Sequence, residues 1–347
     1  MRSIYQDALQ VLALDSGLLS YSCSAPSLEL CVRLKLSTWM RRLWTFQEAI
    51  LPKEVHVRFS DGARTLQDIA QSLQRDEYDN RGHIYRRYGQ LWHTFFDPFI
   101  TKTKGDLIAR FKATWKQLQW RSTTYQSDET ICLATLLGLD VSNILEFPWE
   151  DKEQRMISFL RQMETLPILF AFQPPPRLET CGFRWAPASF LNCFRETATN
   201  PFRLLSGTAT FGPDNQGLNF SQKGFIFKQS VNPSFVGADD FHIAVSNPSM
   251  PLHSVGYRWK ADREARNISG ASKIERPALV YLATDLETNP AILVDVLKSD
   301  SDAVYIEAAY IAVVFVAPVA RFPDDRLRGG VTYQVDERPT DQQWVLY

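Results

Sequence analysis

The chain has 347 residues and a formal net charge of −1, with 45% hydrophobic and 22% charged residues. These values are typical of a soluble globular protein of one large domain or two, with enough apolar surface for a real core. No long run of like charge is present, which excludes an electrostatic footprint for nucleic acid or for an anionic membrane.

The cysteines and the apolar runs indicate the cellular compartment of the protein. Five cysteines are scattered along the chain, and neither C-x-x-C nor a Cys/His cluster with zinc spacing occurs. The N-terminus lacks a basic region followed by an apolar core, so no secretory signal is expected. The longest apolar run, 303–320, contains Glu307 and is rich in Val and Ile, which favours buried strands over a membrane span. We predict a cytoplasmic protein with no metal or other cofactor.

In chain order, the first elements are a helix over 1–10, a buried strand over 11–14 that ends at Asp15, and a helix that starts at Ser27. Apolar residues recur at helical spacing in both helices. We expect the following side chains to point inward: Ile4, Ala8, Leu28, Cys31, Val32 and Leu36.

The strongest helical pattern lies between Ser37 and Pro52. Ser37 can cap a first turn, and Pro52 cannot continue a helix. We predict one continuous helix over 38–51 at the centre of a packed unit formed by residues 1–62. Its inward face, at positions i, i+4, i+7 and i+11, consists of Trp39, Leu43, Phe46 and Ile50.

Glu48 falls at the seam between the apolar and the polar face of this helix. On a wheel of about 100° per residue, it lies about 20° from Arg41 and about 40° from Trp44. The pattern predicts Arg41 as a cationic neighbour and Trp44 as an aromatic wall. The alternative is a surface glutamate that pairs with Arg41 or caps a neighbouring loop.

After Pro52, Val55, Val57 and Phe59 alternate with polar residues, which predicts a half-buried strand before the Asp61-Gly62 turn. Residues 63–173 carry mainly helical patterns. The candidate helices are 63–73, 85–94, 111–118, 130–139 and 150–164.

A run of prolines at 174–176 follows a predicted strand over 168–172 and marks a boundary. From there to 347, short β-type runs alternate with Pro and Gly. The predicted fold class is α+β, with a partial α/β segment, a helical middle and a β-rich C-terminal region. The candidate strands after 200 are 202–205, 225–227, 241–245, 278–283, 291–297, 304–316 and 331–335.

One motif in the 38–51 region carries a resemblance. The pattern R-x-W-T-x-Q-E resembles the signature of the fungal heterokaryon-incompatibility (HET) domain, and it is formed by Arg42, Trp44, Thr45, Gln47 and Glu48. The upstream segment is similar to the one that precedes this signature in the family, through Ile4, Tyr5, Ala8 and Asp15. The likeness covers about the first 60 residues and matches the C-terminal part of a HET domain, without the family's N-terminal segments. Residues 121–134 and 182–189 also resemble parts of fungal HET proteins.

The resemblance implies a role in fungal non-self recognition and programmed cell death, through binding to a protein partner. It also implies a TIR-like fold for the first segment. Some TIR domains cleave NAD with one helical glutamate, so the alternative is an NAD glycohydrolase in which Glu48 is catalytic. Glu48 would then stabilise an oxocarbenium-like ribose as nicotinamide departs. NAD is a ligand only in this alternative, and a product without activity is a third possibility.

Four other residues are candidates for a structural or functional role. Arg42 suits a phosphate or a buried carboxylate, and an internal salt bridge, for example to Asp15, is the favoured interpretation. Asp128 and Glu129 start a predicted helix, where an interaction with the helix dipole fits better than acid–base chemistry. Trp185, in R-W-A-P, is expected to anchor the β-rich region on the helical one.

Overall fold

The computed structural model describes residues 2–79, 106–118, 120–172, 176–191, 207–227, 230, 241–245, 255–261, 274–281, 289–299, 305–318, 332–333 and 341–347. The chain divides into two compact units. The first consists of Met1–Met163 and Ser189–Arg195, and the second of Glu164–Ala188 and Glu196–Tyr347. Helices and mixed sheets are both present, so the α+β class is confirmed. None of the helices in the described ranges is long and apolar enough to span a membrane.

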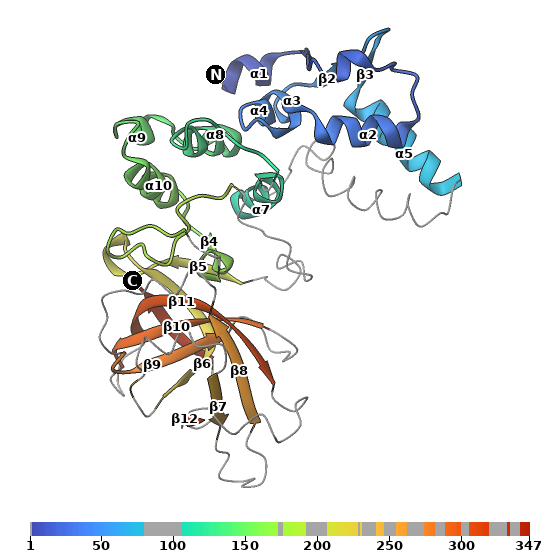
Figure 1. The fold of residues 1–347 in the computed structure, drawn as a ribbon. Coiled ribbons are helices and arrows are strands. Elements are labelled where there is room, and N and C mark those ends of the chain that lie inside the picture. The colour runs from blue at the N-terminus through green and yellow to red at the C-terminus, as the bar shows by residue number, and fades with distance from the viewer. Residues whose placement is uncertain are drawn as a thin grey trace. The chain divides into compact units, whose positions relative to one another are not determined.

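The first unit starts with a three-stranded sheet in the order β1-β2-β3 (Figure 1). The strands are β1 (Gln10–Ala13), β2 (Glu54–Arg58) and β3 (Ala63–Thr65). β1 and β2 are parallel, and β2 and β3 are antiparallel. Helix α1 (Arg2–Asp7) precedes the sheet. The β1–β2 connection contains the 3-10 turn η1 (Leu18–Ser20) and helices α2 (Ser27–Leu36), α3 (Thr38–Arg41) and α4 (Thr45–Ile50).

Helix α2 packs on α5 (Leu66–Asp79), and both contribute to the core beneath the sheet. The buried face of α2 differs from the predicted one, because α5 and the sheet fix its inward direction. Leu36 is 59% exposed, and Ile4 in α1 is 69% exposed, so both predictions were wrong. The core side chains include Leu30, Cys31, Leu34, Val55, Val57, Phe59, Ile69 and Leu73.

A helical layer completes the first unit. It consists of α7 (Leu107–Leu118), α8 (Asp128–Leu137), α9 (Ser142–Leu145) and α10 (Lys152–Arg161). Asp151 caps α10 by accepting a hydrogen bond from the backbone N–H of Gln154, and Gly138 ends α8 with φ of 76°. Their core contains the aromatic cluster Phe111, Trp115, Phe159 and Phe190. The predicted helix over 85–94 lies outside the described residues.

The predicted continuous helix over 38–51 is wrong, because the chain forms two short helices, α3 and α4. Ser37 caps α3 as predicted, accepting from the backbone N–H of Met40. At Arg42 the backbone is extended, with φ of −74° and ψ of 136°. There it forms a β-bridge with Ser122, whose N–H donates to Arg41 O at 2.7 Å and whose carbonyl accepts from Leu43 N at 2.9 Å. These long-range bonds replace the helical hydrogen bonds at the break.

The second unit is built on a ten-stranded sheet. Its path is β12-β7-β8-β11-β10-β9-β6-β5-β4, and the short turns η2 (Ile168–Phe172) and η3 (Pro213–Asn215) accompany it. The strands are β4 (Leu166–Pro167), β5 (Thr208–Phe211), β6 (Leu218–Ile226), β7 (Phe241–Val245), β8 (Val255–Ala261), β9 (Pro277–Tyr281), β10 (Asn289–Lys298), β11 (Ile306–Pro318), β12 (Thr332–Tyr333) and β13 (Asp341–Leu346).

Strand β13 closes part of this sheet on itself. It pairs in parallel with β11 and antiparallel with β6, so that β6, β9, β10, β11 and β13 form a continuous ring. Trp344 of β13 is fully buried and donates from Nε1 to Gln222 O at 3.0 Å. A Cβ atom at Gly224 would collide with this indole, which explains the glycine in β6.

Two predictions for this part of the chain need correction. Residues 168–172 form the buried 3-10 turn η2 and not a strand, because a short apolar run does not by itself select between the two. The division between units falls after Met163, ahead of the prolines. Residues 1–62 and 63–163 belong to one unit, since the 38–51 region bonds to residues 121–132. The run at 303–320 contains β11, and residues 202–205 are not among those described.

Candidate functional site around the R-x-W-T-x-Q-E motif

Glu48 lies in α4 with its side chain half-buried. Its carboxylate accepts a hydrogen bond from Trp39 Nε1 at 3.1 Å. Tyr5, from α1, is its second partner: burial raises the pKa of Tyr5, and the charge of Glu48 and a hydrogen bond to it add to that rise. Helices α1, α3 and α4 thus meet at one carboxylate, and both of its partners are aromatic side chains that can donate.

The predicted neighbours of Glu48 were wrong. Trp44 Nε1 instead donates to Asp128 Oδ2 at 2.8 Å, and Arg41 is exposed. The angles expected from a continuous helical wheel do not apply, because the chain changes direction at Arg42.

Arg121 supplies a buried positive charge beneath the motif. Its Nη1 donates to Arg42 O at 2.8 Å and to Thr45 Oγ1 at 3.3 Å, and its guanidinium carbon lies 4.3 Å from the centre of the Phe46 ring. Burial lowers the pKa of Arg121 to about 9, and the charge of Glu48 acts in the opposite direction. Arg121 is therefore held as a cation at neutral pH.

Thr45 and Gln47 are turned into the protein. Thr45 Oγ1 bonds to the carbonyl oxygens of Trp39 and Arg42, the latter at 2.7 Å. Gln47 is fully buried, and its Nε2 donates to Cys132 O at 3.4 Å. Burial raises the pKa of Cys132 to about 12, so this thiol is neutral and is not a nucleophile.

The two motif segments form one site. Residues 42–48 bond to Arg121, Ser122, Asp128 and Cys132, all within the 121–134 segment. Both segments are recognisable in the sequence, but their contact was not predicted, and neither was Trp39 as a donor or Arg121 as the buried cation. Arg121 and the acidic pair Asp128-Glu129 in the second segment were the sequence features that could have indicated this contact.

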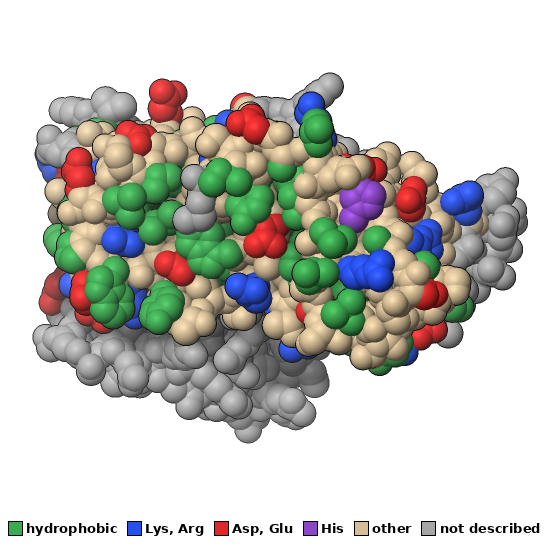
Figure 2. Space-filling view, turned by 90° about the horizontal axis from the view of Figure 1, so that it is seen from above, with side chains coloured by type: hydrophobic (Ala, Val, Ile, Leu, Met, Phe, Trp, Pro, Cys, Tyr) green, Lys and Arg blue, Asp and Glu red, His purple; other side chains and the backbone are tan. Residues whose placement is uncertain are grey.

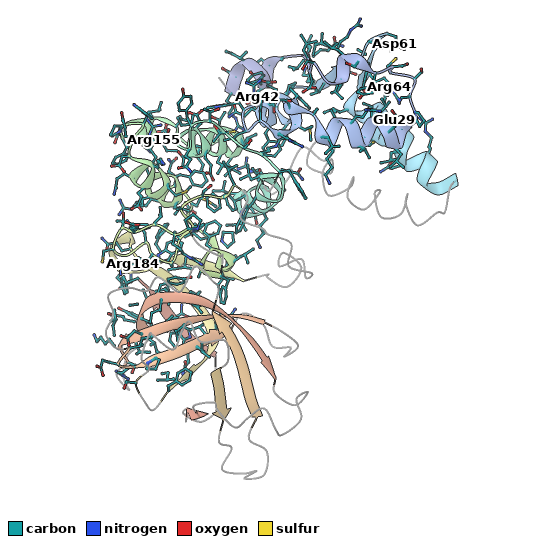
Figure 3. The ribbon with its side chains drawn as sticks, viewed as in Figure 1. Glu29, Arg42, Asp61, Arg64, Arg155 and Arg184 are labelled. Atoms are coloured by element: carbon teal, nitrogen blue, oxygen red, sulfur yellow. The ribbon has the colours of Figure 1, made fainter. Side chains whose placement is uncertain are left out.

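The predicted salt bridge between Arg42 and Asp15 was wrong. Asp15 Oδ2 accepts from Trp39 N at 2.9 Å, and its Oδ1 accepts from the backbone N–H groups of Gly17 and Leu18. Asp15 thereby satisfies a free N–H in the first turn of α3. The side chain of Arg42 is exposed at the break between α3 and α4 (Figure 3).

Asp128 and Glu129 do lie in the first turn of α8, but each has a specific partner. Glu129 is buried and accepts from Ser189 Oγ at 2.7 Å, Phe190 N at 2.5 Å and Leu191 N. Burial raises the pKa of Glu129 to about 7, although these three hydrogen bonds oppose the rise. The carboxyl holds the 189–191 segment, whose Phe190 ring enters the aromatic cluster.

Trp185 belongs to the second unit. It is fully buried, donates from Nε1 to Gly182 O at 2.9 Å, and packs against Phe183 and Phe211. Its expected role as an anchor between regions stays a prediction.

No protein-family model, no curated protein and no solved structure matches this chain. Within the described ranges, no group of three or more His, Cys, Asp or Glu side chains is placed to hold a metal ion. A functional assignment therefore rests on the motif and on its geometry.

Proposed function

We propose that the chain is a HET-type signalling module of the fungal cytoplasm, which binds a protein partner in non-self recognition that leads to cell death. The main support is that most motif side chains form hydrogen bonds inside the protein. Trp44, Thr45 and Gln47 are bound to groups inside the first unit. Side chains used in this way build a scaffold and are not free to contact a substrate.

A rigid scaffold of this kind suits recognition, because its surface groups are held in place before a partner arrives. Arg41 and Arg42 are exposed where the two short helices meet. The parallel pair β1–β2 with its helical connection is compatible with a TIR-like layer, which is part of the proposal.

One observation favours an NAD glycohydrolase as the second candidate. The carboxylate of Glu48 is half-buried, and Trp39 and Tyr5 fix its position. A carboxylate held in this way could stabilise positive charge on a ribose as nicotinamide leaves. In that reaction Tyr5 and Trp39 would be positioning residues.

Inducible expression in a filamentous fungus separates the two candidates. Cell death is scored with a vital dye and cellular NAD is measured, for the wild type, Glu48→Gln and Thr45→Val at matched protein levels. We expect the wild type and Glu48→Gln to kill equally with unchanged NAD. Thr45→Val should kill less, because it removes a hydroxyl that accepts from buried Arg121.

Two results would contradict the interaction module. If NAD falls with the wild type, and Glu48→Gln abolishes both NAD loss and killing, the glycohydrolase is favoured. Release of nicotinamide from NAD by the purified chain, lost in Glu48→Gln at an unchanged melting temperature, would have the same meaning. Loss of a charge partner in the transition state costs about 10²–10³ in rate, so the difference would be easy to detect.

A further inference from the structure

Helix α1 lies against the first unit without burying an apolar side chain. None of its six residues is buried, and Ile4 is 69% exposed. Figure 2 views the molecule from the side on which α1 lies in Figure 1, and it shows hydrophobic side chains at the surface with single charged groups between them. A helix of six residues is not stable by itself in water, so α1 depends on its contacts with the rest of the unit.

Two side chains on one face of α1 make these contacts. Arg2 and Tyr5 are three positions apart, so they project from the same side of the helix. Both are half-buried. Arg2 reaches the C-terminus of α8, where its Nη1 donates to Thr135 O, and Tyr5 bonds to the Glu48 carboxylate of α4. One short helix thus bridges the two elements that form the candidate site.

The contact of Arg2 with α8 is favoured by one effect and opposed by two others. The last carbonyl groups of a helix lack partners within it and carry partial negative charge, which suits a cation. The guanidinium packs over Gly138 so closely that a Cβ atom there would lie 3.2 Å from Nη1. Burial and the positive charge of Arg110 in α7 both lower the pKa of Arg2, so docking of this cation also costs free energy.

We propose that α1 is a strap that closes over the Glu48 carboxylate and controls the access of other molecules to it. With α1 docked, the Tyr5 hydroxyl occupies the carboxylate. With α1 released, Tyr5 leaves, while Trp39 in α3 still donates to Glu48 at 3.1 Å. Segments that bury few apolar side chains open at low cost, so release leaves the core of the unit intact. It exposes a carboxylate that is still held in position.

The strap can serve either candidate function, and its biological use rests on the function proposed above. In the interaction module it withholds a charged group from the partner. In the glycohydrolase it withholds the same carboxylate from the ribose of NAD. Access to Glu48 can be measured without a partner and without NAD, so the strap and the proposed function can fail separately.

Chemical labelling of Glu48 tests the strap. The full chain is treated briefly with a water-soluble carbodiimide and an amine, and peptide mass spectrometry compares the labelling of Glu48 with that of exposed Glu146. The strap variants are Tyr5→Phe, which removes the hydroxyl, and Arg2→Met, which keeps the length of the side chain without its donors. The matched control is Ile4→Gln, on the outward face of the same helix.

We expect Glu48 to label slowly in the wild type and in Ile4→Gln. Labelling should be at least about tenfold faster in both strap variants, as for loss of one hydrogen bond to a charged group. Arg2→Met is decisive, because Arg2 bonds to α8 whereas Glu48 lies in α4. Faster labelling in this variant has to come from release of α1 and not from a contact removed at the carboxylate. Hydrogen exchange of the amides of residues 2–8 should rise with it, at an unchanged melting temperature.

Two results would overturn the strap. If Glu48 of the wild type labels as fast as Glu146, nothing closes over the carboxylate. If Glu48 labels equally in the wild type and in Arg2→Met, release of α1 does not control access to it. Should Arg2→Met lower the melting temperature, Arg2→Lys replaces it, since lysine keeps the charge and loses the planar fork, and the same increase in labelling is then required.

Discussion

At the scale of single residues, most charged groups of the site are bound inside the first unit. Arg121 and Glu129 are buried, while Glu48 is half-buried. Buried charges need specific partners to offset desolvation, and the hydrogen bonds of Arg121 and Glu129 supply them. Glu48 is the one carboxylate among the motif side chains, which is why the NAD candidate depends on it.

Glu129 gives a prediction about pH. Its pKa rises from 4.5 to about 7 in the folded protein. Below about pH 4.5 the carboxyl is neutral in both states. Between about pH 4.5 and about pH 7 the unfolded chain ionises first, so the free energy of unfolding falls by up to about 3 kcal/mol and then stays constant as pH rises further.

Glu129→Gln should remove this slope and be more stable than the wild type at about pH 8, because an amide oxygen can still accept from the Phe190 N–H without a buried charge. Urea unfolding at about pH 5 and about pH 8 measures the effect. Glu146→Gln, at an exposed position, is the control and should keep the wild-type slope. An unchanged slope in Glu129→Gln would show that another group titrates.

At the scale of elements, the break between α3 and α4 depends on a distant segment. The Trp44 indole donates to Asp128, which lies in the first turn of α8. The β-bridge between Arg42 and Ser122 holds the same two segments together. Loss of one such bond should therefore loosen the whole contact.

Trp44→Phe keeps an aromatic ring but removes the N–H that Asp128 accepts. We expect it to lower the free energy of unfolding by about 1.5–3 kcal/mol, as for a hydrogen bond to a charged group. Thermal melting or urea unfolding measures the loss. Trp149→Phe, at an exposed tryptophan, is the control and should change stability little. Equal stability of Trp44→Phe and wild type would mean that the indole bond contributes nothing.

At the scale of the whole molecule, each unit is stabilised by contacts between segments far apart in sequence. In the first unit the 121–132 segment bonds to the motif. In the second, β13 joins β6 and β11 to close the ring. Both arrangements bring together segments that are far apart in the chain, and closing the long loops between them costs conformational entropy. Each arrangement is therefore stable only when the rest of its unit is folded.

Gly224→Ala tests the ring. The added methyl would collide with the buried indole of Trp344, and we expect a loss of about 1–3 kcal/mol from overpacking. Trp344→Phe makes room for it, so the double variant should lose less than the sum of the single losses. Unfolding followed by the intrinsic fluorescence of the chain measures all three variants. Additive losses would show that the two positions do not contact.

The sequence by itself determined the local elements. The cap at Ser37, the alternation of Val55 and Val57, and the apolar run of β11 were predicted, because capping and periodicity depend on residues a few positions apart. The helices near 111–118, 130–139 and 150–164 were also found, within a few residues at their ends.

Only the tertiary structure decided where the chain breaks at Arg42, which partners Glu48 and Trp44 take, and which face of α2 is buried. Each of these is set by groups outside the local window: Ser122 and Asp128 for the break and for Trp44, Tyr5 for Glu48, and α5 for α2. The two backbone bonds to Ser122 and the indole bond to Asp128 each contribute about 1 kcal/mol or more, and together they outweigh helix-propensity differences of less than about 1 kcal/mol per residue. Local pattern fixes what an element can be, and long-range contacts fix where it ends and what it faces.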